Sequence, residues 1–218
     1  MNLLALIGLG LFLGMRHATD ADHVVAVTAI ASRSRSIWQS AGVGALWGLG
    51  HTLTIFVVGT AIIMFSIAVP PRVGLSLEFA VGIALAIVGC LNVAGRRGPM
   101  TSGLGENDVP RLRAFLVGLV HGLAGSAAVA LLVLATVREP RAAVAYLLVF
   151  GFGTVLGMML VTMAFAVPTS MAARRFDFAA PGVRLSTGLL SAAFGLWVMY
   201  QVGFVDGLFR SIPHWTPR

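Results

Sequence analysis

Two histidines, two aspartates and an arginine lie within eight consecutive residues of an otherwise apolar stretch. The motif reads Arg16-His17-Ala18-Thr19-Asp20-Ala21-Asp22-His23, between the apolar segments 3–14 and 24–31. Each charge near the centre of a membrane helix costs ~2.5–3.5 kcal/mol, so the three charges would cost roughly 8–10 kcal/mol if nothing compensated them. A divalent cation bound by imidazole and carboxylate groups supplies that compensation. The motif therefore predicts a metal site inside a membrane.

An unbroken helix would not bring these side chains to one ion. His17, Asp20 and His23 step by three residues and drift around a regular helix, and Asp22 points away from His17. We therefore expect the helix to unwind around residues 18–21, which is allowed in a membrane where the backbone lines a cavity.

Arg16 is expected to support the site and not to bind the metal. Arg16 and Asp20 are spaced i, i+4, which is close enough for an ion pair on one helix. Such a pair would partly neutralise Asp20 and leave His17, Asp22 and His23 as the closest ligands.

The composition is that of an integral membrane protein. Of 218 residues, 58% are hydrophobic and 11% are charged, and the mean hydropathy is +0.93, well above that of soluble domains. The net charge is +7, and all 15 basic residues are arginines in short segments between apolar runs. This distribution is typical of membrane-protein loops, so we expect a lipid bilayer and no nucleic acid as partner. The single cysteine, Cys90, excludes a disulfide within one chain and is expected to be a small buried residue.

Apolar runs of membrane-spanning length predict six transmembrane helices. The predicted fold is an all-α integral membrane protein of two inverted three-helix repeats. The first repeat is 1–97 with the metal motif, a cytoplasmic linker follows at 98–110, and the second repeat with a short tail is 111–218. No soluble catalytic domain fits in this chain, so we expect no enzyme activity. The predicted spans are 3–31, 39–65, 74–94, 111–137, 142–167 and 183–205.

The repeat is visible in the sequence. Gly14-Met15-Arg16-His17 recurs as Gly118-Leu119-Val120-His121, and Trp47-Gly48-Leu49-Gly50 recurs as Phe150-Gly151-Phe152-Gly153. Each half has an odd number of spans, so the second copy must be inverted in the membrane. Inverted repeats with a site near the midplane are an architecture of transporters. The third spans repeat Gly82 and Gly89 as Gly188 and Gly195.

The repeat adds two histidines to the site. His121 corresponds to His17, so span four is expected to bring it toward the same cavity, and His51 lies on span two where the second half has Thr154. Each of these two histidines is expected to be either a ligand of the metal or a residue that lines the transport pathway. Glu78 lies at the start of span three. It is expected either to be a carboxylate stabilised by the positive end of the helix dipole or to line the mouth of the transport pathway. The alternative to a metal site is that His17, Asp20, Asp22 and His23 form a polar network that stabilises helix packing. The predicted metal-binding residues are His17, Asp20, Asp22, His23, His51 and His121, with Arg16 in support.

Arginine counts predict the orientation. The loops after spans one, three and five contain nine arginines, and the opposite side contains five. Because cytoplasmic loops are enriched in arginine, both ends of the chain are expected outside the cytoplasm, in a multi-pass protein of the cell membrane.

Imidazole and carboxylate ligands without thiolate suit Ni(II), Co(II), Zn(II) or Mn(II). The motif 16–23 resembles the signature of the nickel/cobalt transporter family, and Gly50-His51-Thr52 resembles a segment of that family's following helix. The resemblance implies a permease in which the histidines and aspartates of the motif are essential, with His51 nearby. The chain lacks the acidic segment that typical members carry after Leu119 and is shorter than they are. It is therefore more similar to the compact, urease-accessory type of nickel permease.

Uptake of Ni(II), alternatively Co(II), is the predicted function, with the metal as transported substrate and no permanently bound cofactor. The oligomeric state is left open. A metal exporter of similar build is the first alternative. The second is a membrane electron carrier or enzyme-complex subunit, which would need redox cysteine pairs or axial histidine pairs for haem. A single cysteine excludes the dithiol version, and the absence of a P-loop motif means that ATP coupling would require a separate subunit.

Overall fold

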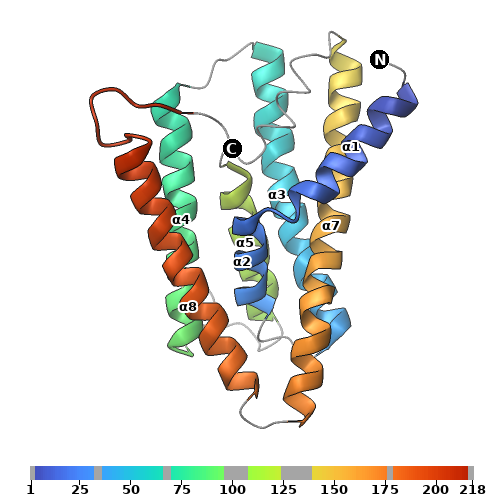
Figure 1. Ribbon diagram of the computed structural model, residues 1–218. Helices are drawn as coiled ribbons and strands as arrows, with labels where there is room; N and C mark the ends of the chain where they lie inside the picture. Colours follow the sequence, from blue (N-terminus) through green and yellow to red (C-terminus); the bar gives the residue numbers. More distant parts are fainter. Residues whose placement is uncertain are drawn as a thin grey trace.

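Every regular element that the structure describes is a helix, in agreement with the predicted fold class. The computed structural model describes residues 3–31, 36–65, 70–95, 108–123, 139–175 and 179–215. Most helices stand side by side, whereas α1 crosses the bundle obliquely (Figure 1). In chain order the elements are α1 (Leu3–His17), α2 (Ala21–Ala31), α3 (Ile37–Phe65), α4 (Pro71–Val93), α5 (Asp108–Leu123), α7 (Pro140–Arg175), α8 (Ala179–Tyr200) and the π-helix η3 (Gln201–Val205).

The first predicted span consists of two helices. α1 ends at His17 and α2 begins at Ala21. Between them, the amide of Thr19 donates to the Arg16 carbonyl (2.9 Å) and the amide of Asp20 donates to the His17 carbonyl (3.1 Å). These three-residue turns tighten the backbone and change its direction, which leaves α1 oblique and α2 upright in the middle of the bundle (Figure 1). The unwinding expected in this stretch is therefore confirmed.

Local signals explain where two of the long helices begin. Ser36 precedes α3, and its hydroxyl oxygen accepts a hydrogen bond from the Gln39 amide (3.1 Å), which satisfies one of the free amides of the first turn. Pro71 occupies the start of α4, where its missing amide hydrogen costs nothing.

Four helical segments are long and apolar enough to cross a membrane, judged by length and composition: 37–61, 71–93, 141–169 and 181–205. α5 begins at Asp108 and not after Pro110 as predicted, because proline is tolerated in the first turn of a helix. The rest of that predicted span, 124–137, lies outside the described residues, as does most of the linker predicted at 98–110. The structure thus supports a membrane protein. Among the described residues, four helical segments are long enough to span a membrane, whereas the sequence predicted six spans.

Glycines allow close packing between α1 and α7 and between α3 and α5. Gly14 of α1 lies against the Phe150 carbonyl of α7, and Gly118 of α5 lies against the Trp47 carbonyl of α3. A Cβ atom on either glycine would overlap that carbonyl oxygen. Small residues at such positions let helix backbones approach within direct contact.

α4 and α8 form a second closely packed pair. A Cβ atom on Gly82 would lie 3.0 Å from the Gly195 carbonyl oxygen, and one on Gly188 would lie 3.0 Å from the Gly89 carbonyl oxygen. α2 contacts both this pair and α3, α5 and α7, so it occupies the centre of the bundle (Figure 1).

The directions of the helices follow a regular pattern. α1 and α5 run in opposite directions, as do α3 and α7, and α4 and α8 (Figure 1). The start of α1 and the end of η3 lie at the same end of the bundle, at the top of Figure 1, which is called the upper end below.

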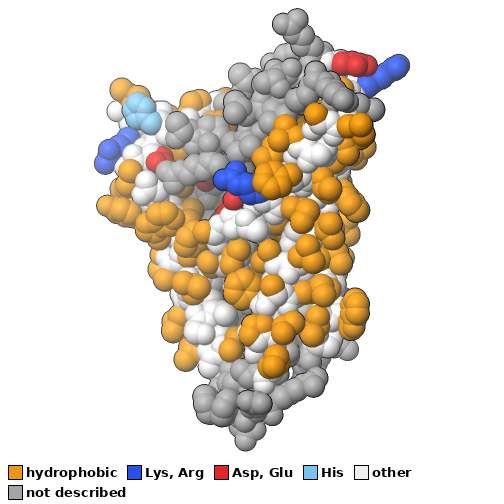
Figure 2. All heavy atoms as spheres, turned by 45° about the vertical axis from the view of Figure 1, so that its right-hand side comes forward, with side chains coloured by type: hydrophobic (Ala, Val, Ile, Leu, Met, Phe, Trp, Pro, Cys, Tyr) orange, Lys and Arg blue, Asp and Glu red, His pale blue; other side chains and the backbone are white. Residues whose placement is uncertain are grey.

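Large apolar side chains cover the outside of the bundle. Trp38, Met64 and Phe152 are 81%, 72% and 65% exposed, and one face shows an apolar surface over most of its height with charged side chains near the upper end (Figure 2). A soluble monomer rarely exposes so much apolar surface, so this exterior is suited to lipid. Cys90 is exposed, and its predicted burial is therefore wrong: an apolar run in a membrane helix faces lipid as readily as protein.

Candidate metal centre

The break between α1 and α2 brings two histidines together. The Nδ1 atom of His23 lies 2.8 Å from the His17 carbonyl oxygen, and the two ring centroids are 4.5 Å apart. A carbonyl oxygen only accepts hydrogen bonds, so Nδ1 of His23 carries the proton and Nε2 carries a lone pair. His23 is fully buried, and its Nε2 has no hydrogen-bond partner among the described residues.

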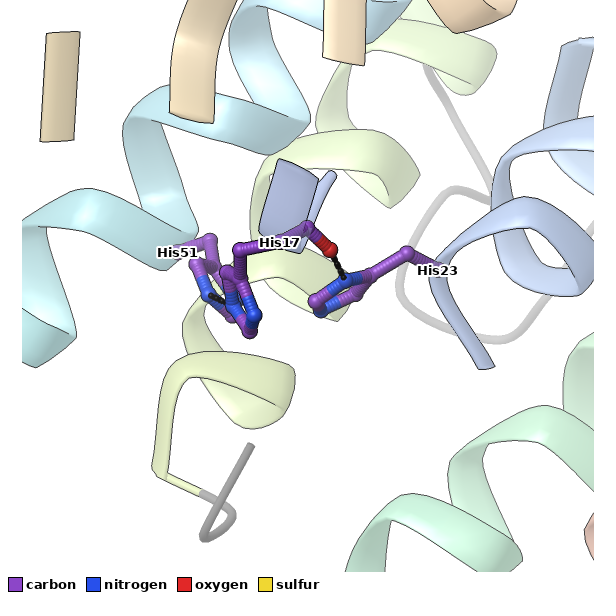
Figure 3. A group of neighbouring side chains, drawn as sticks. All are labelled: His17, His23 and His51. Atoms are coloured by element: carbon purple, nitrogen blue, oxygen red, sulfur yellow. Dashed lines mark hydrogen bonds between the residues drawn. The ribbon is translucent and has the colours of Figure 1, made fainter. Parts of the chain in front are cut away.

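His51 joins this pair from α3. Its Nε2 atom lies 2.9 Å from Nε2 of His17, and its ring centroid lies 4.9 Å from that of His23. Figure 3 shows the three side chains turned toward one another from α1, α2 and α3. The side chains of His17 and His51 are both buried, at 6% and 0% exposure, so an ion between them would be largely removed from water.

His121 approaches from α5, as expected from the repeat. Its Nε2 atom lies 2.9 Å from an Asp22 carboxylate oxygen, and its ring centroid lies 4.9 Å from that of His23. The carboxylate accepts this hydrogen bond, so Nε2 of His121 is the donor. A histidine contributed from the second half of the chain therefore meets an aspartate of the first half.

Two overlapping groups of potential ligand atoms result. Those of His17, His23 and His51 lie within 4.8 Å of one another, and so do those of Asp22, His23 and His121. His23 belongs to both groups. The fold thus brings five of the six predicted metal-binding residues together, from four helices.

Asp20 has a different position from that predicted. Its carboxylate accepts a hydrogen bond from Nδ1 of His17 (2.9 Å), and the exposed Arg16 side chain forms no ion pair with it in the described part of the chain. The predicted Arg16–Asp20 pair is wrong because the helix ends at His17, so the i, i+4 spacing does not apply. Asp20 instead orients His17 through the nitrogen opposite Nε2.

A cavity of about 400 Å³ borders this cluster, and its lining includes residues of η3. Because η3 ends at the upper end of the bundle (Figure 1), this cavity is called the upper cavity. His17, Asp20 and Asp22, at the break between α1 and α2, line it together with Glu78 of α4 and residues of α8 and η3. Among the described residues of this lining, Arg16 is the one basic side chain besides the histidine, so these residues carry more carboxylates than cations. The other lining residues are Leu13, Ala21, Val81, Phe194, Trp197, Val198, Gln201 and Val202.

Sequence reasoning did not assign Trp47, which closes one side of the cluster. Its ring centroid lies 5.3 Å from that of His23 and 5.6 Å from that of His121, both in edge-to-face arrangements. Trp47 lies one helical turn before His51, and this spacing on one helix face was the signal that could have identified it. The indole is fully buried and gives the histidines a rigid apolar wall.

Comparisons with known proteins indicate the family of this chain. The model of the NicO family, described as high-affinity nickel-transport protein, matches residues 3–93, the part of the chain from α1 through α4. The urease accessory protein UreH of Bacillus sp. (strain TB-90) is 34% identical over 222 aligned residues, which cover 96% of this chain and 97% of that protein.

A more distant relative matches a part of its own length. The Arabidopsis thaliana chloroplast protein FOR GROWTH AND FERTILITY 2 is 28% identical over 165 residues, which cover 68% of this chain and 44% of that protein. No solved structure matches the chain. The nearly full-length similarity to UreH and the NicO match over the histidine–aspartate motif show that the chain belongs to the nickel permease family, and that it is a membrane transport protein for nickel and not an enzyme.

Proposed function

We propose that this protein imports Ni(II), or the chemically similar Co(II), across the cell membrane through the cluster of histidines and aspartates. The state of His23 carries the proposal. Its Nδ1 proton is committed to the His17 carbonyl, and its buried Nε2 lone pair has no hydrogen-bond partner among the described residues. A buried polar atom left unpaired costs ~1–3 kcal/mol, and a bound cation would remove that cost.

The spacing of the histidines supports coordination. The Nε2 atoms of His17 and His51 are 2.9 Å apart. Two imidazole nitrogens bound at ~2.0–2.1 Å to one ion, at right angles to each other, lie about 2.9 Å apart. The pair is therefore spaced like adjacent ligands. When an ion binds, the proton of this hydrogen bond leaves the space between the two Nε2 atoms, and each nitrogen then has a lone pair for the metal.

Hydrogen bonds to the opposite ring atoms orient the ligands. Asp20 accepts from His17 and the His17 carbonyl accepts from His23, and such partners determine which imidazole nitrogen is available to the metal. Asp22 supplies a carboxylate beside His121. Because the two groups of ligand atoms share His23, an ion can move from one group to the other without losing all its ligands at once.

We further propose that residues 1–97 and 111–218 are two inverted repeats that alternate access to this site. The opposite directions of α1 and α5, of α3 and α7, and of α4 and α8 support the inversion (Figure 1). The glycine contacts support it independently: Gly14 lies against Phe150 and Gly118 lies against Trp47. The sequence repeat aligns the two glycines with each other and the two aromatic residues with each other, so the contacts are reciprocal, as a two-fold axis requires.

The upper cavity supports import. Its lining includes residues at the break between α1 and α2 and residues of η3, and η3 ends at the same end of the bundle as the start of α1 (Figure 1). The arginine counts predict that this end lies outside the cytoplasm. A cavity with an excess of carboxylates on that side would collect cations from outside the cell.

The function is tested by metal accumulation in cells with and without the protein, and then in proteoliposomes, with nickel, cobalt, zinc and manganese each supplied alone. We expect nickel, and to a smaller extent cobalt, to accumulate faster when the protein is present. Reduced accumulation would indicate an exporter. Unchanged movement of all four metals by well-folded protein in proteoliposomes would contradict the proposal.

The orientation gives a separate prediction. Reporter domains fused after residue 218 and in the segment 96–107 should report opposite sides of the membrane, with the first outside the cytoplasm and the second inside. A pair of reporters, one active outside and one active inside the cell, checks this directly. The reverse result would require the upper cavity to open to the cytoplasm and would favour export.

Protons should compete with nickel at the cluster. Imidazole binds a metal only in its deprotonated form, so nickel affinity should fall as the pH is lowered from about 7.5 to about 5.5, by up to about tenfold per pH unit if one proton competes. Calorimetry of the purified protein with Ni(II), in buffers of different ionisation enthalpy, should count about one proton released per ion. A count of zero over this range would contradict proton exchange.

A further inference from the structure

The segment that follows η3, residues 206–215, folds back onto the start of α4. Gly207 has a φ of 85°, which allows the sharp turn, and the His214 amide donates to the Asp206 carbonyl (2.9 Å). These two features bring Trp215 to α4, where its indole Nε1–H donates to a Glu78 carboxylate oxygen (2.9 Å).

The contact between Trp215 and α4 is closely fitted. Gly74 lies under the indole, and a Cβ atom on Gly74 would overlap three atoms of that ring system. Gly74 and Glu78 are one helical turn apart on the same face of α4, so one tryptophan packs on the first and donates to the second. The Phe79 and Phe209 rings add an edge-to-face contact with centroids 5.4 Å apart.

Glu78 connects this segment with the metal pathway. It lines the upper cavity together with His17, Asp20 and Asp22. A carboxylate in the lining of a cavity attracts a divalent cation into that cavity, without direct contact with the buried histidines. The indole is a neutral donor, so it restricts the position of the carboxylate and does not cancel its charge.

We propose that Glu78 is an outer recruiting residue for the transported cation, and that Trp215 positions its carboxylate in the upper cavity. The inference rests on the proposed transport through the histidine cluster and adds a second place of contact for the ion. Glu78 acts on capture of the metal, so it affects the concentration dependence of transport. Trp215 acts only through Glu78 and is a positioning residue.

The test is nickel uptake by the full chain in proteoliposomes. Glu78→Gln retains the size and the hydrogen-bonding oxygen but removes the charge, and we expect KM for nickel to rise about tenfold with Vmax within about twofold. Trp215→Phe keeps a ring and removes the N–H donor, and Gly74→Ala displaces the ring without changing a polar group. Both should raise KM in the same direction by a smaller factor.

The double variant Glu78→Gln/Trp215→Phe separates positioning from a merely structural role. If Trp215 acts through Glu78, the double variant has the KM of Glu78→Gln alone, because coupled residues are not additive. Raising the ionic strength should increase KM of the unmodified protein more than KM of Glu78→Gln. An unchanged KM in Glu78→Gln, or losses that multiply in the double variant, would overturn the proposal.

Equilibrium binding distinguishes this proposal from the transport proposal itself. Glu78→Gln should bind Ni(II) at the inner cluster with unchanged stoichiometry, measured by calorimetry, whereas His23→Ala should not. If the unmodified protein transports nickel and Glu78→Gln does so with the same KM, recruitment by Glu78 is wrong and transport through the cluster stands. If the unmodified protein moves no metal, both proposals are overturned.

Discussion

Nickel uptake should fall to the background of cells without the protein when His23 is replaced by alanine. His23 is the residue shared by both groups of ligand atoms, and its Nε2 is a buried nitrogen without a hydrogen-bond partner among the described residues. Removing it takes a ligand from every arrangement of the ion in the cluster. Uptake of radioactive or mass-detected nickel, normalised to the amount of protein in the membrane, is the measurement.

The same outcome is expected for His17→Ala and Asp22→Ala. Asp20→Ala should lower nickel affinity by a smaller factor, about 10- to 100-fold, because Asp20 orients His17 and does not belong to either group. His214→Ala is the matched control, since that histidine side chain is exposed and far along the chain from the cluster. Normal uptake by well-expressed His23→Ala protein would refute the metal site.

Alanine at Gly14 or Gly118 should destabilise the bundle more than alanine at most other glycines. Each of these two glycines lies against a carbonyl of the neighbouring helix, and a Cβ atom would overlap it. Neither helix can yield without shifting its backbone, and overpacking of this kind costs ~1–3 kcal/mol. At about 2–4 °C per kcal/mol for a chain of this size, the melting temperature in detergent should fall by several degrees, and nickel uptake should fall because His17 and His121 move with their helices.

Gly8 and Gly42 provide the matched controls. An added Cβ atom would meet nothing within 4 Å at either position, and alanine favours a helix by about 1 kcal/mol over glycine. Gly8→Ala and Gly42→Ala should therefore leave the melting temperature unchanged or slightly higher. Equal losses at all four positions would show that the glycines matter for a reason other than close packing.

The sequence alone predicted the residues of the candidate site and the helix break that lies among them, and the structure has that break between α1 and α2. Three charges and two histidines in one apolar segment are so costly in lipid that a ligand and an irregular backbone follow from local physics. Repeated glycine and histidine motifs also predicted that His121 approaches the site, and the contact with Asp22 agrees. The helix break and the approach of His121 could be predicted because the first depends on residues that are neighbours in sequence and the second depends on the internal sequence repeat.

The tertiary structure decided the roles within that set. Asp20 and Asp22 are equivalent by composition, yet one orients His17 and the other meets His121, because the turn between α1 and α2 points them in different directions. The contact of Trp215 with Glu78 joins residues 137 positions apart, and no periodicity in either segment predicts it. Which residues become partners over such distances depends on how whole helices pack. That packing depends on contacts between a glycine of one helix and the backbone of another, and a short stretch of sequence does not show which helices will meet.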